Sequence, residues 1–171
     1  MRNGWDERKA DRIGKVREYV DGVIGRIPDR EIQKEAFVHL YGVSQACGLI
    51  AMKRGEDAEL AVIAGMLHDI WRYSRMESRD HAHKGAGLVR DILIPMGLFE
   101  EWEVEKICHA VYHHSGKGIC QEPFDEVLKD GDVFEHCMFD PTQEPKAKEF
   151  ARFLRLRAEF GLGDGEGDRR R

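Results

Sequence analysis

The sequence predicts an all-α fold, a compact array of six or seven helices. Its 171 residues include only five prolines, and long stretches run without proline or glycine. Apolar residues recur at intervals of three and four, which places them on one face of a helix. No segment of convincing length alternates apolar and polar residues as a half-buried strand does. There is no wide linker and no internal repeat, so we expect one domain over residues 1–160 and a flexible glycine-rich tail over residues 161–171.

The first three helices are expected over residues 6–24, over residues 29–54, and from about residue 57 to at least residue 71. Glycine and proline follow the first of these stretches, and Gly55 follows the second. Glycine just beyond the last helical residue is a common C-terminal stop because it adopts a left-handed conformation at little cost.

The later helices are expected over residues 80–93, 100–114, 124–139 and 144–160. Pro95 and Gly97 should stop the first of these, two glycines just after residue 114 the second, and Pro141 the third. The complete pattern contains only helices joined by short connections, as in orthogonal helical arrays.

Composition narrows the class of protein. Hydrophobic residues make up 42% of the chain, charged residues make up 35%, and the formal net charge is −5. This balance is typical of a soluble protein and argues against a nucleic-acid backbone binder or a polybasic membrane anchor. No apolar run approaches the roughly 20 residues that span a bilayer, and residues 1–12 lack the apolar stretch of a signal peptide.

The spacing of the cysteines indicates a reducing compartment. Four of them are widely spaced and form no C-x-x-C pair, namely Cys47, Cys108, Cys120 and Cys137. A zinc ribbon or a disulfide scaffold is therefore not expected, and the sequence favours a cytoplasmic protein with reduced thiols. Leu98, Phe99 and Trp102 could form an exposed apolar patch for a homo-oligomer, or part of the core; the sequence leaves both open.

Several expected helices carry an ionisable residue inside an apolar stripe. His39 completes a stripe with Ala36 and Val43, His68 and His114 continue similar stripes, and Asp132 lies in the middle of the helix over residues 124–139. Burying such groups costs several kcal/mol unless each finds a partner. A shared metal ion would satisfy them together, although a single histidine on an apolar face can equally be a hydrogen-bonded core residue.

The pair His68-Asp69 is more informative than a lone histidine. It ends the apolar run over residues 61–67 with two adjacent polar groups. Neighbours on a helix differ by about 100°, so Asp69 can approach an ion beside His68. Histidine and aspartate ligands suit Mn²⁺, Fe²⁺, Zn²⁺ or Mg²⁺.

These motifs resemble the HD superfamily of metal-dependent phosphohydrolases, over about residues 30–140. The family signature is a histidine, a His-Asp doublet and a distant aspartate on separate helices. The matching residues are His39 in Phe-Val-His-Leu-Tyr-Gly-Val, His68-Asp69 in Ala-Gly-Met-Leu-His-Asp-Ile, and Asp132 in Leu-Lys-Asp-Gly-Asp-Val-Phe. The family commonly shows Asp-x-Asp with the second aspartate as the ligand, so the resemblance favours Asp132 over Asp130, which is left as a turn or an indirect partner.

Some branches of the family hold two metal ions, with Asp69 implied as the bridge between them. The resemblance then implies His83 and His114 as further ligands. His109 and His113 stay possible members of the second metal site or indirect partners, with a solvated position as a further alternative for His109. His81 is left as a solvated residue or an indirect partner. The implied cofactor is one or two divalent ions of Mn, Fe, Mg, Zn, Co or Ni.

The implied activity is hydrolysis of a phosphate ester of a small molecule, expected to be a nucleotide, with Asp69 and Arg72 as catalytic residues. Many members continue the doublet as His-Asp-Ile-Gly-Lys, whereas this chain has Trp71-Arg72 at the last two positions. Arg72, Lys84 and Lys117 are candidate phosphate contacts, with an ordinary surface or loop charge as the alternative for each. The alternative function is a non-catalytic HD domain, braced by its metal, that serves as a binding or regulatory module.

Overall fold

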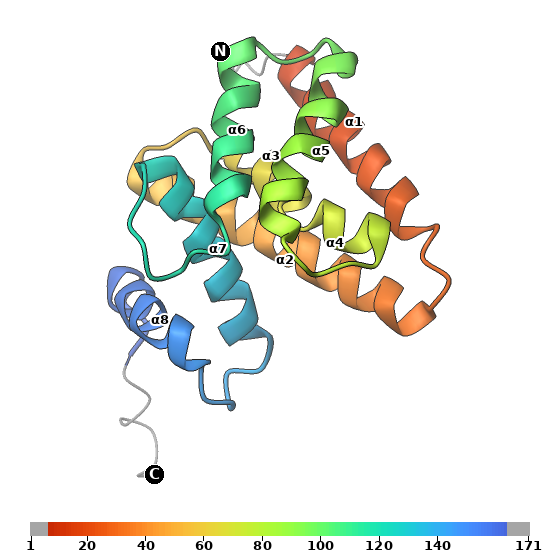
Figure 1. The fold of residues 1–171 in the computed structure, drawn as a ribbon. Helices are drawn as coiled ribbons and strands as arrows, with labels where there is room; N and C mark the ends of the chain where they lie inside the picture. The colour runs from red at the N-terminus through yellow and green to blue at the C-terminus, as the bar shows by residue number, and fades with distance from the viewer. Residues whose placement is uncertain (1–6, 164–171) are drawn as a thin grey trace.

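The computed structural model describes residues 7–163, which form eight helices and no strand (Figure 1). Their bounds are α1 Glu7–Ile24, α2 Arg30–Arg54, α3 Ala58–Leu67, α4 Ile70–Arg75, α5 His81–Met96, α6 Glu101–His113, α7 Pro123–Phe139 and α8 Ala147–Glu159. The predicted all-α class is confirmed. The expected boundary of the domain stays a prediction, and most of the expected tail, residues 164–171, lies outside the described residues.

The expected third helix is in fact two helices, because the chain breaks at His68-Asp69. His68 still has helical dihedral angles (φ −58°, ψ −38°), whereas Asp69 (φ −108°, ψ 17°) leaves the helical region before α4 begins. The break is the reason that eight helices are present in the described part instead of six or seven. It also places the doublet at a corner between two helices.

Two other helix ends differ from expectation. Pro95 does not stop α5, which continues one residue further to Met96 and ends at Gly97 in the left-handed conformation (φ 62°). A proline so close to the end disturbs few of the helix hydrogen bonds. The last helix begins at Ala147 instead of residue 144, immediately after a segment that contains Pro145.

Helix α2 lies at the centre of the fold, between α3 and α7 (Figure 1). Gly65 on α3 allows a very close approach to α2, since a Cβ there would lie only 2.6 Å from Ser44 Cα. Gly131 on α7 does the same on the other side, where a Cβ would collide with Cys47. These small residues let three helices carrying polar groups come close together.

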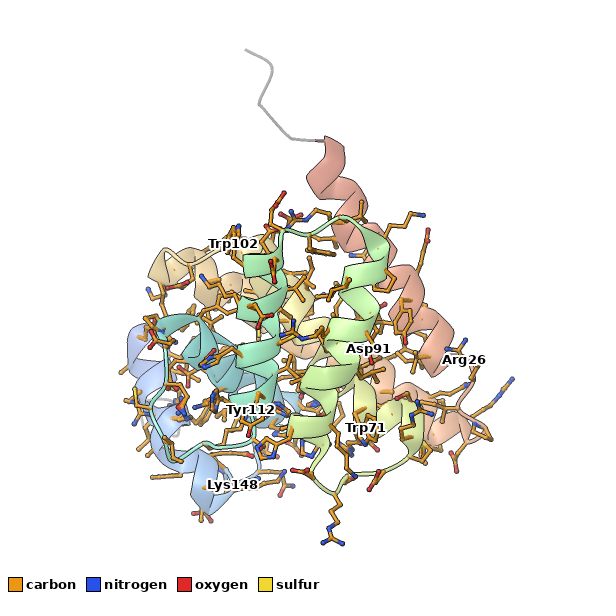
Figure 2. All side chains as sticks on the ribbon, turned by 45° about the horizontal axis from the view of Figure 1, so that its top comes forward. Arg26, Trp71, Asp91, Trp102, Tyr112 and Lys148 are labelled. Carbon is orange, nitrogen blue, oxygen red and sulfur yellow. The ribbon has the colours of Figure 1, made fainter. Side chains whose placement is uncertain are left out.

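Helices α5 and α6 run side by side, with α6 packed on α3 and α5 packed on α4 (Figures 1 and 2). Phe99, before α6, is partly buried and packs against the core, whereas Trp102 is 59% exposed at the N-terminal end of α6 (Figure 2). Among the described residues no helix is long and apolar enough to cross a membrane.

Candidate metal centre

The four residues of the signature converge from three parts of the fold. His39 comes from α2, His68 and Asp69 from the corner between α3 and α4, and Asp132 from α7. His39 Nε2 lies 3.1 Å from His68 Nε2, 3.6 Å from Asp69 Oδ2 and 3.8 Å from Asp132 Oδ1. His68 Nε2 lies 3.9 Å from each of the same two oxygens. All four side chains are buried.

The other oxygen of Asp69 faces a second group of histidines. Asp69 Oδ1 lies 3.2 Å from His81 Nε2 and 3.4 Å from His114 Nε2, and these two nitrogens are 3.2 Å apart. The sequence analysis preferred His114 for such a group, and the structure places it there. It places His81 beside His114, where His83 was expected.

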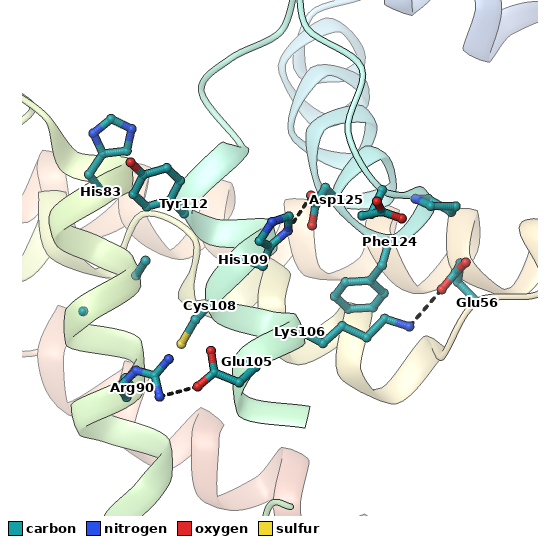
Figure 3. A pocket seen from close by; sticks show the side chains of 14 residues that line it. Glu56, His83, Arg90, Glu105, Lys106, Cys108, His109, Tyr112, Phe124 and Asp125 are labelled. Carbon is teal, nitrogen blue, oxygen red and sulfur yellow. Dashed lines mark hydrogen bonds and ion pairs between the residues drawn. The ribbon is translucent and has the colours of Figure 1, made fainter. Parts of the chain in front are cut away.

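His83 points away from this centre. Its ring stacks on Tyr112 at 4.1 Å between centroids (Figure 3). Its Nδ1 pairs with Asp80 at 2.7 Å. The reason is the helical position: His81 lies one turn before the buried Gly85, whereas His83 lies one turn before the exposed Gly87. His83 as a ligand of this centre is therefore corrected to His81.

Two neighbouring residues on α7 were missed in the sequence analysis. His136 stacks on His39 with ring centroids 5.0 Å apart, and its Nε2 lies 3.6 Å from Asp132 Oδ1. Glu135 Oε2 lies 2.8 Å from His39 Nδ1. The spacing of four residues between Asp132 and His136 on an expected helix was a signal that could have revealed His136.

The ring orientations of the histidines share one pattern. In each case Nδ1 hydrogen bonds outward and Nε2 faces the centre. The outward partners are the Gly65 carbonyl for His68 (2.8 Å), the Ser78 carbonyl for His81 (2.8 Å), the Val111 carbonyl for His114 (2.7 Å) and the Glu135 carboxylate for His39 (2.8 Å). Carbonyls only accept hydrogen bonds, so Nδ1 carries the proton and Nε2 of a neutral ring presents a lone pair inward.

This pattern fits a metal ion. The lone pairs of His81 and His114 face each other at 3.2 Å, and neither Asp69 Oδ1 nor Asp132 Oδ1 has a hydrogen-bond partner although both atoms are buried. Buried acceptors without donors are unfavourable unless a cation lies among them. The ligand-type atoms of the inner residues form groups within 4.8 Å of one another, among them His39-His68-Asp69, His68-His114-Asp132, Asp69-His81-His114 and His39-Asp132-His136.

The electrostatics of the metal-free site show how tightly its charges are coupled. Burial alone would lower the pKa of His39, but the carboxylates of Asp69, Glu135 and Asp132 outweigh burial and raise the pKa to about 9. Burial lowers the pKa of His68 to about 3. Burial would raise the pKa of Asp69 and Asp132, but charged and hydrogen-bonding neighbours hold both pKa values well below the usual range. Both carboxylates are therefore ready to bind a cation.

Of the candidate phosphate contacts, two lie at the site. Arg72 Nη1 lies 3.3 Å from Asp69 Oδ2, and Nη2 donates to Glu35 Oε1 at 2.8 Å. Lys117 is buried, and its ammonium group contacts Asp132. Lys84 is placed elsewhere, since it pairs with Glu77 at 2.7 Å and lies over the ring of Trp71, so Lys84 is withdrawn as a phosphate contact.

The remaining candidates lie outside the centre. Asp130 pairs with Arg54 and Arg152, each at 2.8 Å, and so joins α7 to α2 and α8. His109 and His113 point to Asp125 at the start of α7, away from Asp69.

A pocket of about 610 Å³ opens onto the metal centre. Its floor includes His39, Asp69, His81, His114 and Asp132. Its walls carry several cationic side chains, Lys34, Arg72, Lys117, Lys146 and Lys148, together with the exposed ring of Phe139. Glu31, Glu35, Glu135 and Glu149 line the pocket as well, and the centre is accessible to a small molecule.

Comparisons with known proteins agree with this geometry. The family model described as HD domain matches residues 36–136, more than half of the chain. The fold is similar to that in the crystal structure of a predicted HD superfamily hydrolase from an uncultured Thermotogales bacterium. That similarity has a TM-score of 0.57 at 22% identity and covers 84% of this chain and 88% of the other. A search of curated proteins gave no match. The chain belongs to the HD-domain family.

Proposed function

We propose that this protein is a metal-dependent phosphohydrolase that cleaves a phosphate ester of a small molecule, a nucleotide, with water activated at one or two divalent ions. The observation that carries the proposal is the position of Asp69. Its Oδ2 faces His39 and His68 while its Oδ1 faces His81 and His114. A carboxylate so placed can give one oxygen to each of two ions.

The residues divide naturally between two ion positions. His39, His68, Asp69 and Asp132 would hold one ion, and the other side of Asp69 with His81 and His114 would hold the second. A bound ion lowers the pKa of its water and neutralises charge on the phosphoryl oxygens. The outward hydrogen bonds of the histidines fix each ring before an ion arrives.

The chain itself supplies charge for the substrate. Arg72 lies at the edge of the centre with a side chain 35% exposed, so part of its guanidinium faces the pocket. Guanidinium can bind two phosphate oxygens at once. Lys117 adds a buried ammonium group beside Asp132. Lys146, the residue before α8, and Lys148, within α8, line the same pocket.

The proposal of a nucleotide rests on Phe139. Its ring is 72% exposed and lines the same pocket as the cationic side chains. An exposed aromatic ring beside a phosphate-binding region offers a surface on which a base can stack.

A matched pair of variants tests the proposal. Purified parent, His81→Ala and His83→Ala proteins are assayed with each candidate ion against phosphomonoesters, phosphodiesters and a panel of nucleotides. The two histidines lie two residues apart on α5, but only His81 faces Asp69. We expect kcat/KM to fall at least about 100-fold in His81→Ala and to stay within about threefold in His83→Ala. Equal activity of the two variants, or a parent that is inactive with every ion and substrate, contradicts the proposal.

The alternative is a non-catalytic domain in which the ion only braces the helices. A bracing ion is normally closed to solvent, whereas a catalytic ion keeps an open position. The pocket of about 610 Å³ above the ligands supports the catalytic proposal. Water exchange at bound Mn²⁺, measured by proton relaxation, distinguishes the two, since a closed bracing site gives no fast-exchanging water.

A further inference from the structure

A second group of metal-ligand side chains lies between α6 and the start of α7. It consists of His109, His113 and Asp125, whose ligand-type atoms lie within 4.8 Å of one another. His109 Nδ1 is 2.8 Å from Asp125 Oδ2, and the two histidine rings are 4.5 Å apart between centroids (Figure 3). The metal centre around Asp69, called the HD centre from here on, does not include these three residues.

The adjacent pair His113-His114 separates the two groups. His114 is buried and directs Nε2 to Asp69 Oδ1. Neighbours on a helix differ by about 100°, so His113 shares the face of His109, four residues earlier, and not that of His114. Its Nδ1 lies 3.3 Å from the side-chain amide of Gln121, whose Oε1 is buried without a donor. With the amide turned so that Oε1 accepts from His113 Nδ1–H, Nε2 keeps the lone pair that an ion needs.

Asp125 has the environment of a ligand. It is 1% exposed, and its Oδ2 is buried without a hydrogen bond of good geometry, although the atom faces His109. His109 is half exposed by contrast, with 51% of its side chain accessible. A buried carboxylate oxygen directed at two imidazoles is an arrangement that a divalent cation stabilises.

Next to this group is a pocket of about 710 Å³, distinct from the pocket above the HD centre. His109 and Asp125 line one side of this pocket, and the stacked rings of His83 and Tyr112 line the other (Figure 3). Its cationic side chains are already paired, Lys106 with Glu56 at 3.1 Å and Arg90 with Glu105.

We propose that His109, His113 and Asp125 bind one divalent transition-metal ion of the Zn²⁺ type, at a site separate from the HD centre. Two histidines four residues apart on one helix, completed by a carboxylate, form a ligand set suited to Zn²⁺, Co²⁺ or Fe²⁺. Three protein ligands leave at least one coordination position, which faces the 710 Å³ pocket and takes water or a small anionic ligand.

Zinc stoichiometry tests this assignment with a readout independent of hydrolysis. Parent, His109→Ala, Asp125→Asn and His83→Ala proteins are dialysed against micromolar Zn²⁺, and bound zinc is measured by elemental analysis. His83 is the matched control, because it lines the same pocket but stays outside the three ligands. We expect His109→Ala and Asp125→Asn to lose about one zinc per chain relative to the parent, and His83→Ala to lose none.

A fourth protein separates this site from the HD centre. The double variant His68→Ala/Asp69→Ala should keep about one zinc per chain, which adding His109→Ala then removes. Circular dichroism verifies folding, and His109→Ala carries the test if the buried Asp125 does not tolerate substitution. The proposal is overturned if folded His109→Ala binds as much zinc as the parent, if His83→Ala loses zinc equally, or if the folded double variant binds no zinc.

Discussion

Replacing Gly65 by alanine should both destabilise the fold and weaken metal binding. Gly65 is where α3 meets α2, and a Cβ there would lie 2.6 Å from Ser44 Cα and 2.8 Å from Ser44 N. Both neighbours are backbone atoms, so no side-chain rotation relieves the contact. To reach an ordinary separation of 3.4 Å, the two helices must move apart locally by about 0.8 Å (3.4 minus 2.6).

Two opposing terms set the size of the effect. Overpacking that displaces backbone costs about 1–3 kcal/mol. Alanine in a helix is favoured over glycine by up to about 1 kcal/mol. Because the clash is with backbone atoms, the upper part of that cost applies, about 2–3 kcal/mol. Less about 1 kcal/mol for the helix preference, the free energy of unfolding should fall by about 1–2 kcal/mol. The same displacement would move His68 relative to His39, whose Nε2 atoms lie 3.1 Å apart, so metal affinity should fall as well.

Gly87 provides the matched control. It lies inside α5, and a Cβ added there meets no atom within 4 Å. Gly87→Ala should therefore equal or exceed the parent in stability, by up to about 1 kcal/mol. Urea unfolding of each protein after a chelator has removed its metal gives the free energy of unfolding, and calorimetric titration gives the metal affinity. The close α2–α3 packing argument fails if Gly65→Ala matches Gly87→Ala in urea midpoint and binds metal like the parent.

Four further predictions concern the site. In urea unfolding, the protein freed of metal by a chelator should be most stable near pH 6.5. The pKa of His39 is raised to about 9, so its contribution to stability is complete below pH 6.5 and is lost as the pH rises towards 9. The pKa of His68 is lowered to about 3, so its contribution is complete above pH 6.5 and is lost as the pH falls towards 3. A stability that rises steadily across that range would contradict these two shifts. Glu135→Gln should weaken metal binding about 10- to 100-fold in calorimetric titration, because Glu135 orients His39; unchanged affinity would show that this contact does not matter. Phe139→Ala should raise KM for a nucleotide but not for a small phosphomonoester, and an equal effect on both would exclude base stacking. Metal at about 1,000 times its dissociation constant should stabilise the fold by about 4 kcal/mol over the chelated protein, seen as a higher melting temperature, and an unchanged melting temperature would argue against a metal held by the folded state alone.

The sequence was most informative where a polar residue interrupts an apolar stripe. His39, His68 and His114 all lie on stripes that point into the bundle, and the structure buries all three. Periodicity predicts the direction of His39 inside α2, and it extends to His68 and His114 just after α3 and α6, because the preceding apolar residues define the inner face. Asp132 was chosen by the family resemblance instead, and the structure buries it on α7.

Direction is harder to predict at the start of a helix, where no helical residues precede the side chain. His81 is the first residue of α5, and His81 and His83 are both followed by a glycine four residues later. Gly85 is buried and Gly87 exposed, but glycine has no hydrophobic signal of its own. The sequence signal that remains is two turns away, with Leu88 on the face of His81 and Arg90 on the face of His83. The break at His68-Asp69 was unpredictable for a related reason: no proline or glycine marks it, and tertiary contacts decide it.

The origin of the clustered residues explains why the cluster is suited to a cation. The residues of the metal centre come from five places: α2, the corner between α3 and α4, the first residue of α5, the residue that follows α6, and α7 itself. Packing of the whole core therefore brings them together. That packing leaves two imidazole nitrogens 3.2 Å apart and two carboxylate oxygens buried without donors. Apolar side chains of similar size would pack there without this electrostatic cost. Without an ion, these atoms cost the fold electrostatic free energy, and a bound cation would remove that cost. This is the physical reason to interpret the cluster as a binding site and not as a polar part of the core.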